Sequence, residues 1–522
     1  MTGRRGAAPA GSPLRRAWDE AVAHHQAGRL AEAERIYSRI LLAQSSNAPL
    51  LGNLGAAFRG QGKLAEAIAC YRRALAIDPG NSQAHGNLGN VFRDMGKPEQ
   101  AEACYRRAAE SSPDFAEAHY NLANALKEQG KLAEAEDVFL QALKINPGYL
   151  EACIPLSAVQ ESLGKPEQAR DTLNLGIRNK PFYSDICKGK PLRNVLIFMG
   201  VQDCGFDLSG DYRHKISGGH FSTAEFIRND KFTRHVFYIL DDNLETMGGE
   251  LPGHDIVINT IACPDREQAS LKSLSRFLGG APHAPLINHP DEVLKTTRDN
   301  NYTRLNRLKG ITFPKTIRLT AKDKSAEEIA ALIKKKRLSP PFIIRRTGTQ
   351  TAVSTRLVES FDELGGYLAE TKGEAFYVIE FVECPYRKKY FRKLRLFCID
   401  GELFPVVCHI DEVWNVHGGN RKTLMKKHKW MRNEEKKYLE DCAGYIGAKN
   451  YKVLKSLYSR IKLDFFGIDF NLLDDDSILI YELNPAMRHS FEHAQHFPYL
   501  KPHLEDISRA FAAMAIKKSG KK

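Results

Sequence analysis

The sequence predicts a multidomain protein with an N-terminal all-α solenoid, followed by a small α/β domain and a larger α+β domain. Three observations predict this fold class. A chain of 522 residues is too long for a single hydrophobic core. Residues 13–182 repeat with a period of 34. After residue 193 the pattern changes to strand-like runs that alternate with helix-like segments.

Glycines mark the 34-residue period, and alanines and large side chains follow it. The glycines are Gly28, Gly62, Gly96, Gly130 and Gly164. The alanines are Ala33, Ala67, Ala101, Ala135 and Ala169, and the large side chains are Tyr37, Tyr71, Tyr105, Phe139 and Leu173. This period is typical of tetratricopeptide repeats, each a pair of amphipathic helices. We predict five repeats, over residues 13–46, 47–80, 81–114, 115–148 and 149–182, after a disordered lead-in at residues 1–12.

Asparagines also follow the period, on the first helix of the middle repeats. They are Asn53, Asn87 and Asn121, with Asn90 and Asn124 one helical turn further on. Amide side chains donate and accept hydrogen bonds, which suits binding of an extended peptide backbone in the concave groove of a solenoid. The pattern resembles the asparagine-lined repeat arm of O-linked GlcNAc transferases. The alternative is that these asparagines only bind water. Pro155 interrupts the pattern in the fifth repeat, so we expect the groove to end or change character there.

Composition limits the function classes. The chain is 43% hydrophobic and contains no apolar run of the length that a membrane helix requires, so no membrane association is expected. Its ten cysteines lack CxxC spacing, which favours a reduced, cytoplasmic protein. Residues 1–182 hold 22 of the 76 lysines and arginines and 20 of the 63 acidic residues, so the net charge of +13 belongs mainly to the second half. A nucleotide-phosphate site together with solvated helix faces is the favoured explanation of this charge, and nucleic acid is the alternative.

The second half begins after a polar linker at residues 183–193. Strand-like runs at Asn194–Met199, His235–Leu240 and Asp255–Thr260 alternate with helix-compatible segments, which indicates a small parallel α/β unit. Further strand-like runs follow at Phe342–Arg346, Phe376–Phe381, Leu394–Ile399 and Leu403–Cys408. The last two runs, DFFGIDFNLL and SILIYELNPA, flank an acidic turn and are predicted to form a hairpin.

This last hairpin contains the candidate metal ligands. Glu482 and Asn484 have i, i+2 spacing and therefore face the same side of their strand. The hairpin brings Asp469 beside them, and two carboxylates with an amide oxygen suit Mg²⁺ or Mn²⁺ bridging the phosphates of ATP. The alternative is a surface hairpin with solvated acids. The apolar flanks argue against that alternative, because unpaired polar groups in buried strands are costly.

With these residues, the chain from Asn194 onward resembles the ATP-grasp superfamily, in particular its ribosomal-protein glutamate ligase-like branch. The resemblance implies a pre-ATP-grasp domain at residues 194–318, an ATP-grasp domain at 319–517 and a basic tail at 518–522. It implies an Asp469, Glu482 and Asn484 metal triad. It also implies phosphate contacts from Arg345 and the loop Gly348, Thr349 and Gln350, an adenine hinge at Glu380, Phe381 and Val382, and a nucleotide contact from Asn415.

The chain departs from the family pattern in its basic residues. The first ATP-contacting lysine of the family is replaced near Asn300, and the second is Arg345. The loop after Gln350 reads TAVS where the family carries more glycine, and His409 stands where an arginine is common. Added Cβ atoms keep backbone N–H groups further from phosphate. Arginine for lysine preserves the charge and changes the geometry from a point to a fork.

The resemblance implies an ATP-dependent carboxylate–amine ligase that works through an acyl phosphate. In such an enzyme Arg395 would stabilise charge on the transferred phosphoryl group, and Arg488 would orient a substrate carboxylate. A structural salt bridge is the other interpretation of Arg488. The substrate would be a peptide or protein held by the repeats. Two alternatives stay open: a nucleotide-binding scaffold without turnover, and an ATP-grasp kinase.

Overall fold

A computed structural model describes residues 13–520 with gaps. The gaps are residues 188, 202–204, 209–213, 218–220, 222, 224, 229, 241–243, 245–250, 281–282, 350–353, 372–373, 417–420, 486 and 488–490. The chain divides into two compact units. Unit 1 comprises residues 1–180 and 205–217, and unit 2 comprises residues 181–204 and 218–522.

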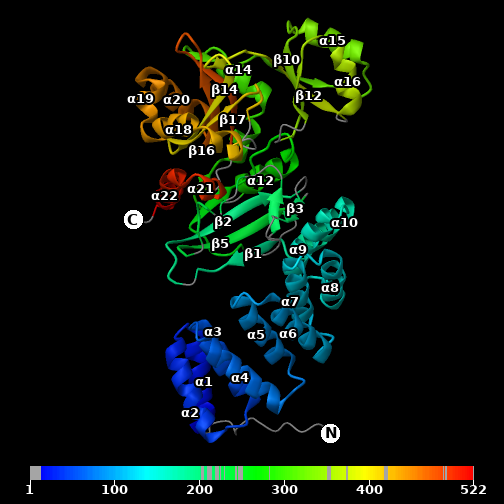
Figure 1. Ribbon diagram of the computed structural model, residues 1–522, viewed down its shortest axis with the longest axis vertical. Coiled ribbons are helices and arrows are strands. Elements are labelled where there is room, and N and C mark those ends of the chain that lie inside the picture. The colour runs from blue at the N-terminus through cyan, green and yellow to red at the C-terminus, as the bar shows by residue number, and fades with distance from the viewer. Residues whose placement is uncertain are drawn as a thin grey trace. The chain divides into compact units, whose positions relative to one another are not determined.

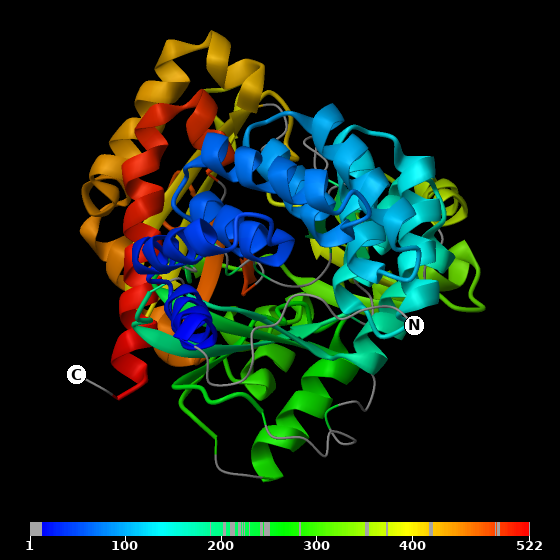
Figure 2. The same ribbon diagram turned by 90° about the horizontal axis from the view of Figure 1, so that it is seen from below.

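Unit 1 contains ten helices within residues 13–180, arranged as five successive pairs (Figures 1 and 2). They are α1 (Pro13–Gln26), α2 (Leu30–Ala43), α3 (Ala48–Gly60), α4 (Leu64–Ile77), α5 (Ser82–Asp94), α6 (Pro98–Ser111), α7 (Ala116–Glu128), α8 (Leu132–Ile145), α9 (Leu150–Ser162) and α10 (Pro166–Asn179). The predicted N-terminal solenoid is therefore confirmed. The first helices of successive repeats contact one another, α3 with α5, α5 with α7 and α7 with α9, as expected on the inner side of a curved array.

The turn inside each repeat explains the periodic glycines. All five have a φ between 69° and 76°, a region that a side chain makes costly. In the second repeat, the amide of Gly62 donates to the carbonyl of Arg59 and the amide of Lys63 to that of Phe58, each at 2.9 Å. These bonds satisfy the last carbonyls of α3. The glycine therefore sets the reversal between the two helices of a repeat.

The periodic alanines and large side chains form the core between the helices. Each alanine of the period is at most 5% exposed, and Tyr37, Tyr71, Tyr105, Phe139 and Leu173 are at most 2% exposed. Two further glycines make room for the tyrosine rings. A Cβ atom at Gly55 would lie 2.8 Å from the ring of Tyr71, and one at Gly89 would lie 2.7 Å from the ring of Tyr105. Close packing of these rings therefore requires glycine on the facing helix.

Unit 1 also contains a hairpin from the later part of the chain. Strands β3 (Gly205–Leu208) and β4 (His214–Ser217) pair antiparallel, and the hairpin packs against α9. These residues lie within the range 194–318 that was assigned to the pre-ATP-grasp domain. Helix α9 itself continues through Pro155, so the proline does not break the helix. It removes the asparagine from the equivalent position of the fifth repeat.

Unit 2 begins with a five-stranded sheet in the order β1-β5-β2-β6-β7. Its strands are β1 (Phe182–Asp185), β2 (Arg193–Gly200), β5 (Phe232–Ile239), β6 (Ile256–Asn259) and β7 (Leu286–Ile287). Apart from the antiparallel β1–β5 pair, the neighbours are parallel, as the alternating pattern predicted. The helices that follow β6 in the chain are α12 (Gln268–Gly280), α13 (Pro290–Leu294) and α14 (Arg298–Leu305). Strand β1 occupies the start of the predicted linker.

A four-stranded antiparallel sheet follows, in the order β11-β10-β12-β9, with α15 and α16 packed on it (Figure 1). Its elements are β9 (Thr316–Thr320), α15 (Ala326–Lys335), β10 (Phe342–Arg346), β11 (Arg356–Val358), α16 (Glu363–Glu370) and β12 (Ala375–Glu380). Its core includes Ile329 and Ile333 of α15, Leu364 and Tyr367 of α16, and Phe342 of β10. The lobe therefore has its own hydrophobic core.

The last sheet has β14 at its centre. Its strands are β8 (Ile311–Thr312), β13 (Pro385–Tyr386), β14 (Tyr390–Ile399), β15 (Glu402–Asp411), β16 (Phe465–Leu472) and β17 (Ile478–Asn484). The remaining helices are α17 (Leu424–Lys427), α18 (Lys429–Glu440), α19 (Cys442–Ile446), α20 (Ala448–Ile461), α21 (Glu492–His496), a 3₁₀ turn (Pro498–Leu500) and α22 (Lys501–Lys518). Strands β16 and β17 form the predicted hairpin.

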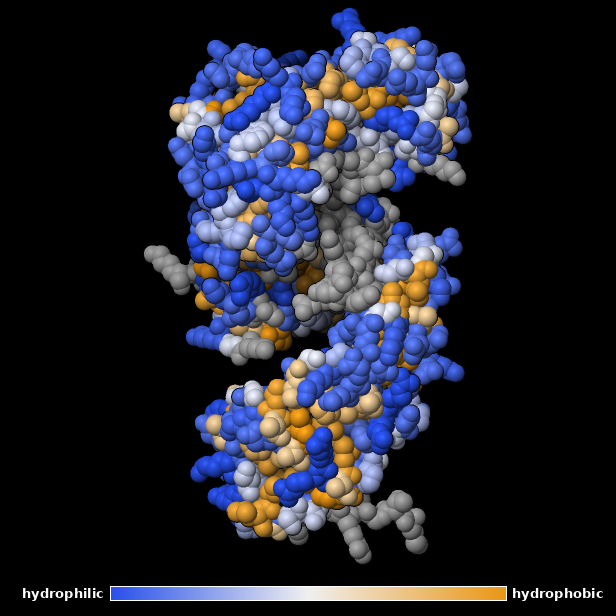
Figure 3. Space-filling view, in the orientation of Figure 1, coloured by the Kyte–Doolittle hydropathy of each residue, from blue (hydrophilic) through white to orange (hydrophobic). Residues whose placement is uncertain are grey.

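On the face drawn in Figure 3, polar side chains predominate and apolar ones gather over the first two repeats. Among the helices of the described residues, none combines the length and the apolar character that crossing a bilayer demands.

We predict opposite effects for two glycine substitutions in the same helix, α5. Gly89→Ala should destabilise unit 1 by about 1–3 kcal/mol, because the added methyl overlaps the Tyr105 ring. Gly86→Ala, which meets no atom within 4 Å, should stabilise α5 by roughly 0.5 kcal/mol. Hydrogen exchange of the α5 and α6 amides in the full chain measures both effects. Equal protection in the two variants would contradict the packing described here.

Candidate functional site

A cavity of about 220 Å³ lies between the four-stranded sheet and the β14 sheet of unit 2. Residues of both sheets line it, among them Ile343 of β10, Ile379 of β12, Phe391 of β14 and Leu479 of β17. Charged side chains line it as well, namely Arg298, Arg345, Glu380, Lys393, Arg395, Asp469 and Glu482. Such a cavity suits a ligand with an apolar ring and a charged tail.

The predicted hinge lies at the apolar part of this cavity. Glu380, Phe381 and Val382, where β12 ends, line it together with Asn415. The ring of Phe381 meets Trp414 edge-to-face at 5.7 Å between centroids. The Glu380 carboxylate accepts a bond from the backbone amide of Lys315 at 3.0 Å. Backbone groups of the hinge and flat side chains therefore border one space.

A row of charged side chains crosses the sheet at the other end. In the strand register Arg395 of β14 is opposite Asp469 of β16, which is opposite Glu482 of β17. Residues directly opposite in antiparallel strands project from the same face. Asp469 is 3% exposed and accepts two bonds from Arg395, at 2.7 and 2.8 Å, with the Lys393 ammonium 3.5 Å away. The row therefore holds an ion pair inside the protein.

The surroundings keep Asp469 ionised and disfavour the charge of Lys393. Burial alone would raise the pKa of the Asp469 carboxyl, but Arg395 and Lys393 overcome it and hold that pKa below its usual value. For Lys393, burial is the main effect and lowers the pKa of its ammonium, against the attraction of Asp469. The contact with Arg395 therefore offsets the burial of the Asp469 carboxylate.

Glu482 lies at the junction of two cavities. Its carboxylate pairs with Arg298 of α14 at 2.5 Å and accepts a bond from the Asn484 amide at 3.0 Å. Burial opposes ionisation, but Arg298 and Arg345 outweigh it and lower the pKa of Glu482 to about 2. The second cavity, of about 40 Å³, shares Arg298, Arg345 and Glu482 with the first and also contacts Asn484.

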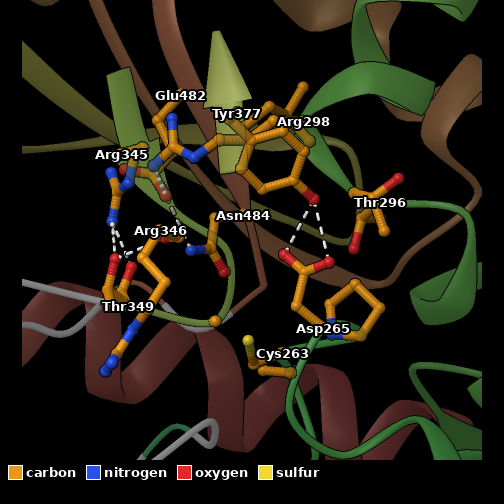
Figure 4. A pocket seen from close by; sticks show the side chains of 15 residues that line it. Cys263, Asp265, Thr296, Arg298, Arg345, Arg346, Thr349, Tyr377, Glu482 and Asn484 are labelled. Atoms are coloured by element: carbon orange, nitrogen blue, oxygen red, sulfur yellow. Dashed lines mark hydrogen bonds and ion pairs between the residues drawn. The ribbon is translucent and has the colours of Figure 1, made fainter. Parts of the chain in front are cut away.

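Figure 4 shows the second cavity. The Arg345 guanidinium donates to the carbonyl of Thr349, and Gly348 takes a φ of 72°. On the opposite side the hydroxyl of Tyr377 donates to both oxygens of Asp265 at 2.8 Å. Arg318 also donates to Asp265, at 2.9 Å. The loop after β10 and the loop after β6 therefore border one small, strongly polar space.

The structure brings together those of the predicted nucleotide and metal residues that it describes. Around the larger cavity lie Arg345, Glu380, Phe381, Val382, Arg395, Asn415, Asp469 and Glu482. Around the smaller one lie Arg345, Gly348, Thr349, Glu482 and Asn484. Gln350 and Arg488 lie outside the described residues.

The cavity residues that sequence reasoning missed include Arg298, Lys393 and Asp265. Arg298 lies two positions before Asn300, where the lysine of the family was judged to be replaced, and it contributes a cation to both cavities. Lys393 could have been predicted, because it lies two residues before Arg395 on a strand, so both side chains project from the same face. Asp265 belongs to no recognisable motif. Its place in the site depends on the fold, which brings the loop after β6 near β12.

The donor set fits a hard divalent cation. Two carboxylates and one amide face the cavities, and oxygen ligands of this kind suit Mg²⁺. In the described part of the chain, no cluster of three or more His, Cys, Asp or Glu side chains is arranged as a metal cage. Further ligands would therefore come from phosphate oxygens or water.

In unit 1 the five predicted groove asparagines divide into two groups. Asn90 accepts a bond from the hydroxyl of Tyr105 at 2.8 Å. Asn124 donates to the carbonyl of Tyr120 at 3.0 Å and accepts from Lys127 at 3.1 Å. Within the described residues, the side chains of Asn53, Asn87 and Asn121 have no intramolecular hydrogen-bond partner and are half-exposed. These three therefore keep their donors and acceptors available.

Comparisons with known proteins concern the N-terminal region. Family models described as tetratricopeptide repeat match residues 14–39, 46–114, 87–149 and 126–186. Residues 13–180 therefore form an array of tetratricopeptide repeats, a class of interaction module. A search of curated proteins gave no match.

Solved structures similar to this chain cover about a third of it. One is described as the crystal structure of MamA, with 21% identity over 31% of this chain and 94% of that one, and a TM-score of 0.29. Another is YrrB, described as a TPR protein with an unusual peptide-binding site, with 23% identity over 32% and 85%, and a TM-score of 0.27.

Proposed function

We propose that this chain is an ATP-dependent ligase of the ATP-grasp type, which joins a carboxylate to an amine on a peptide or protein held by the repeats. The observation that carries the proposal is the row Arg395–Asp469–Glu482 at the end of a cavity whose other end is a hinge with flat apolar walls. A nucleotide matches this arrangement, because its flat base would lie at the hinge and its polyanionic tail at the charged row.

Each group of side chains has a task in this proposal. The hinge at Glu380–Val382 binds the base, and Arg345 with the loop after β10 binds phosphate oxygens. Asp469, Glu482 and Asn484 hold the divalent cation. Bound ATP would supply the phosphoryl group that activates the carboxylate. Arg395, fixed by Asp469, stabilises negative charge that develops at that end of the cavity.

The repeats would deliver the substrate. Asn53, Asn87 and Asn121 repeat along the inner helices α3, α5 and α7 with free amide groups, and a ladder of amides can bind a peptide backbone with little regard for its sequence. A peptide-binding array is useful to a ligase that acts on a peptide or protein, whereas a ligase for small molecules would not need one.

A nucleotide-binding scaffold is the second candidate. It is favoured by the ion pairs Arg298–Glu482 and Arg395–Asp469, which occupy the carboxylates that a metal would need. The two functions differ in turnover. Purified full-length protein with ATP, Mg²⁺, peptides and amines should release ADP only when both substrates are present. A phosphorylated product that is stable would instead indicate a kinase, and ATP binding without any ADP release would indicate the scaffold.

We predict that Glu482→Gln lowers ADP release at least roughly 100-fold, because it removes a charged cation ligand. The expected control is Glu402→Gln, on the exposed start of β15, with unchanged turnover. The measurement is a coupled ADP assay on the full chain, with circular dichroism to check folding. Turnover of the Glu482 variant within a factor of about three of the wild type would refute the assigned cation site.

We also predict that the double change Asn87→Ala and Asn121→Ala weakens peptide binding roughly tenfold or more, since two backbone-directed amides are lost. A peptide that copurifies with the chain, identified by mass spectrometry, is resynthesised and titrated by fluorescence anisotropy. Gln100→Ala, an exposed amide on the outer helix α6, serves as the matched control. If the two variants bind equally well, the asparagine groove is not the binding surface.

A further inference from the structure

The larger cavity is lined by more basic side chains than carboxylates. Among the described residues the basic side chains are Arg298, Arg345, Lys393 and Arg395, and the carboxylates are Glu380, Asp469 and Glu482. Asp265, in the smaller cavity, is already bonded to Arg318 and Tyr377. The balance of charge in the cavity is therefore positive.

Both carboxylates are held by guanidinium groups. Arg395 grips Asp469 with two bonds, and Arg298 lies 2.5 Å from Glu482. A divalent cation at these oxygens would have to displace the arginines or stand beside them, and like charges at such distances repel strongly. While the arginines are in contact with them, these carboxylates are therefore not open to a cation.

The position of Arg298 is built into the fold. It begins α14, and its guanidinium also reaches the carbonyl of Tyr481 at 3.4 Å. Three residues later, buried Asn301 donates to the carbonyl of Leu483 at 3.0 Å, which fastens α14 to β17. The start of α14 is thus anchored beside Glu482 by bonds that do not depend on charge.

Arg298 and Arg345 lie close enough together to repel each other, so an anion between them would be stabilising. Burial and the nearby charge of Arg298 lower the pKa of Arg345 to about 10. A phosphate among these groups would relieve the repulsion, and arginine binds phosphate with a pair of parallel bonds. A polyanion is therefore the ligand that this charge distribution favours first.

We propose that Arg298 controls the order of binding, an inference that rests on the proposed function. The nucleotide phosphates bind first and draw Arg298 away from Glu482. Only then can Glu482, together with Asn484, take the divalent cation, which binds to the protein–nucleotide complex. Arg298 acts here as a positioning residue for Glu482.

The test measures binding of ATP and of Mn²⁺ separately, on full-length protein. ATP is titrated calorimetrically in excess EDTA, and free Mn²⁺ is followed by electron paramagnetic resonance. Wild-type protein should bind ATP in EDTA, and should bind Mn²⁺ only when ATP is present. Arg298→Gln should weaken cation-free ATP binding about tenfold and should tighten Mn²⁺ binding without ATP at least about tenfold. Arg307→Gln, an exposed arginine just after α14, should behave as the wild type.

The outcomes separate the two proposals. If wild-type protein binds Mn²⁺ without ATP as tightly as Arg298→Gln does, or if that variant leaves cation-free ATP binding unchanged, the binding order is wrong and the ligase proposal stands. If no protein binds ATP even with Mg²⁺, the proposed function itself fails. Should Arg298→Gln not fold, the comparison of Mn²⁺ binding to wild-type protein with and without ATP decides the order.

Discussion

The buried ion pair between Asp469 and Arg395 is the constraint on which the rest of unit 2 depends. A carboxylate that is 3% exposed on a central strand stays charged only with cations in contact, and leaving it unpaired would cost several kcal/mol. Strand register supplies those cations, because β14 places Lys393 and Arg395 on the face that Asp469 shares. The same register puts Glu482 next in the row. One pairing pattern thus builds a row of alternating charge that lines the cavity.

Unit 1 is held together by the packing of its helices. Its helices reverse at glycines with positive φ, and its core is a repeated contact of small and large side chains. Its inner helices also bury a charged side chain, because Lys127 of α7 is 5% exposed and donates to Asn124. The amide groups of Asn53, Asn87 and Asn121 stay half-exposed on the same helices.

Much of this could be predicted from the sequence, for physical reasons. A five-fold glycine period reports a backbone conformation that other residues adopt at a cost, so the repeats could be delimited to within a few residues. The i, i+2 spacing of Glu482 and Asn484 is enough to assign both side chains to one face of a strand. Arg298 could not be assigned, because its partner Glu482 is far along the chain and the contact depends on how α14 meets β17. Nor could the bonds that occupy Asn90 and Asn124, or the docking of strands β3 and β4 on α9, be inferred from spacing.

The central claim is that the cavity between the two sheets receives a nucleotide, base at the hinge and phosphates at the arginines. Photo-crosslinking of the full chain with 8-azido-ATP and Mg²⁺, with the modified peptides mapped by mass spectrometry, tests it most directly. The account predicts that adducts concentrate in residues 379–384 and 414–416, and that excess unlabelled ATP prevents them. Adducts scattered over both units, or labelling that ATP does not suppress, would contradict it.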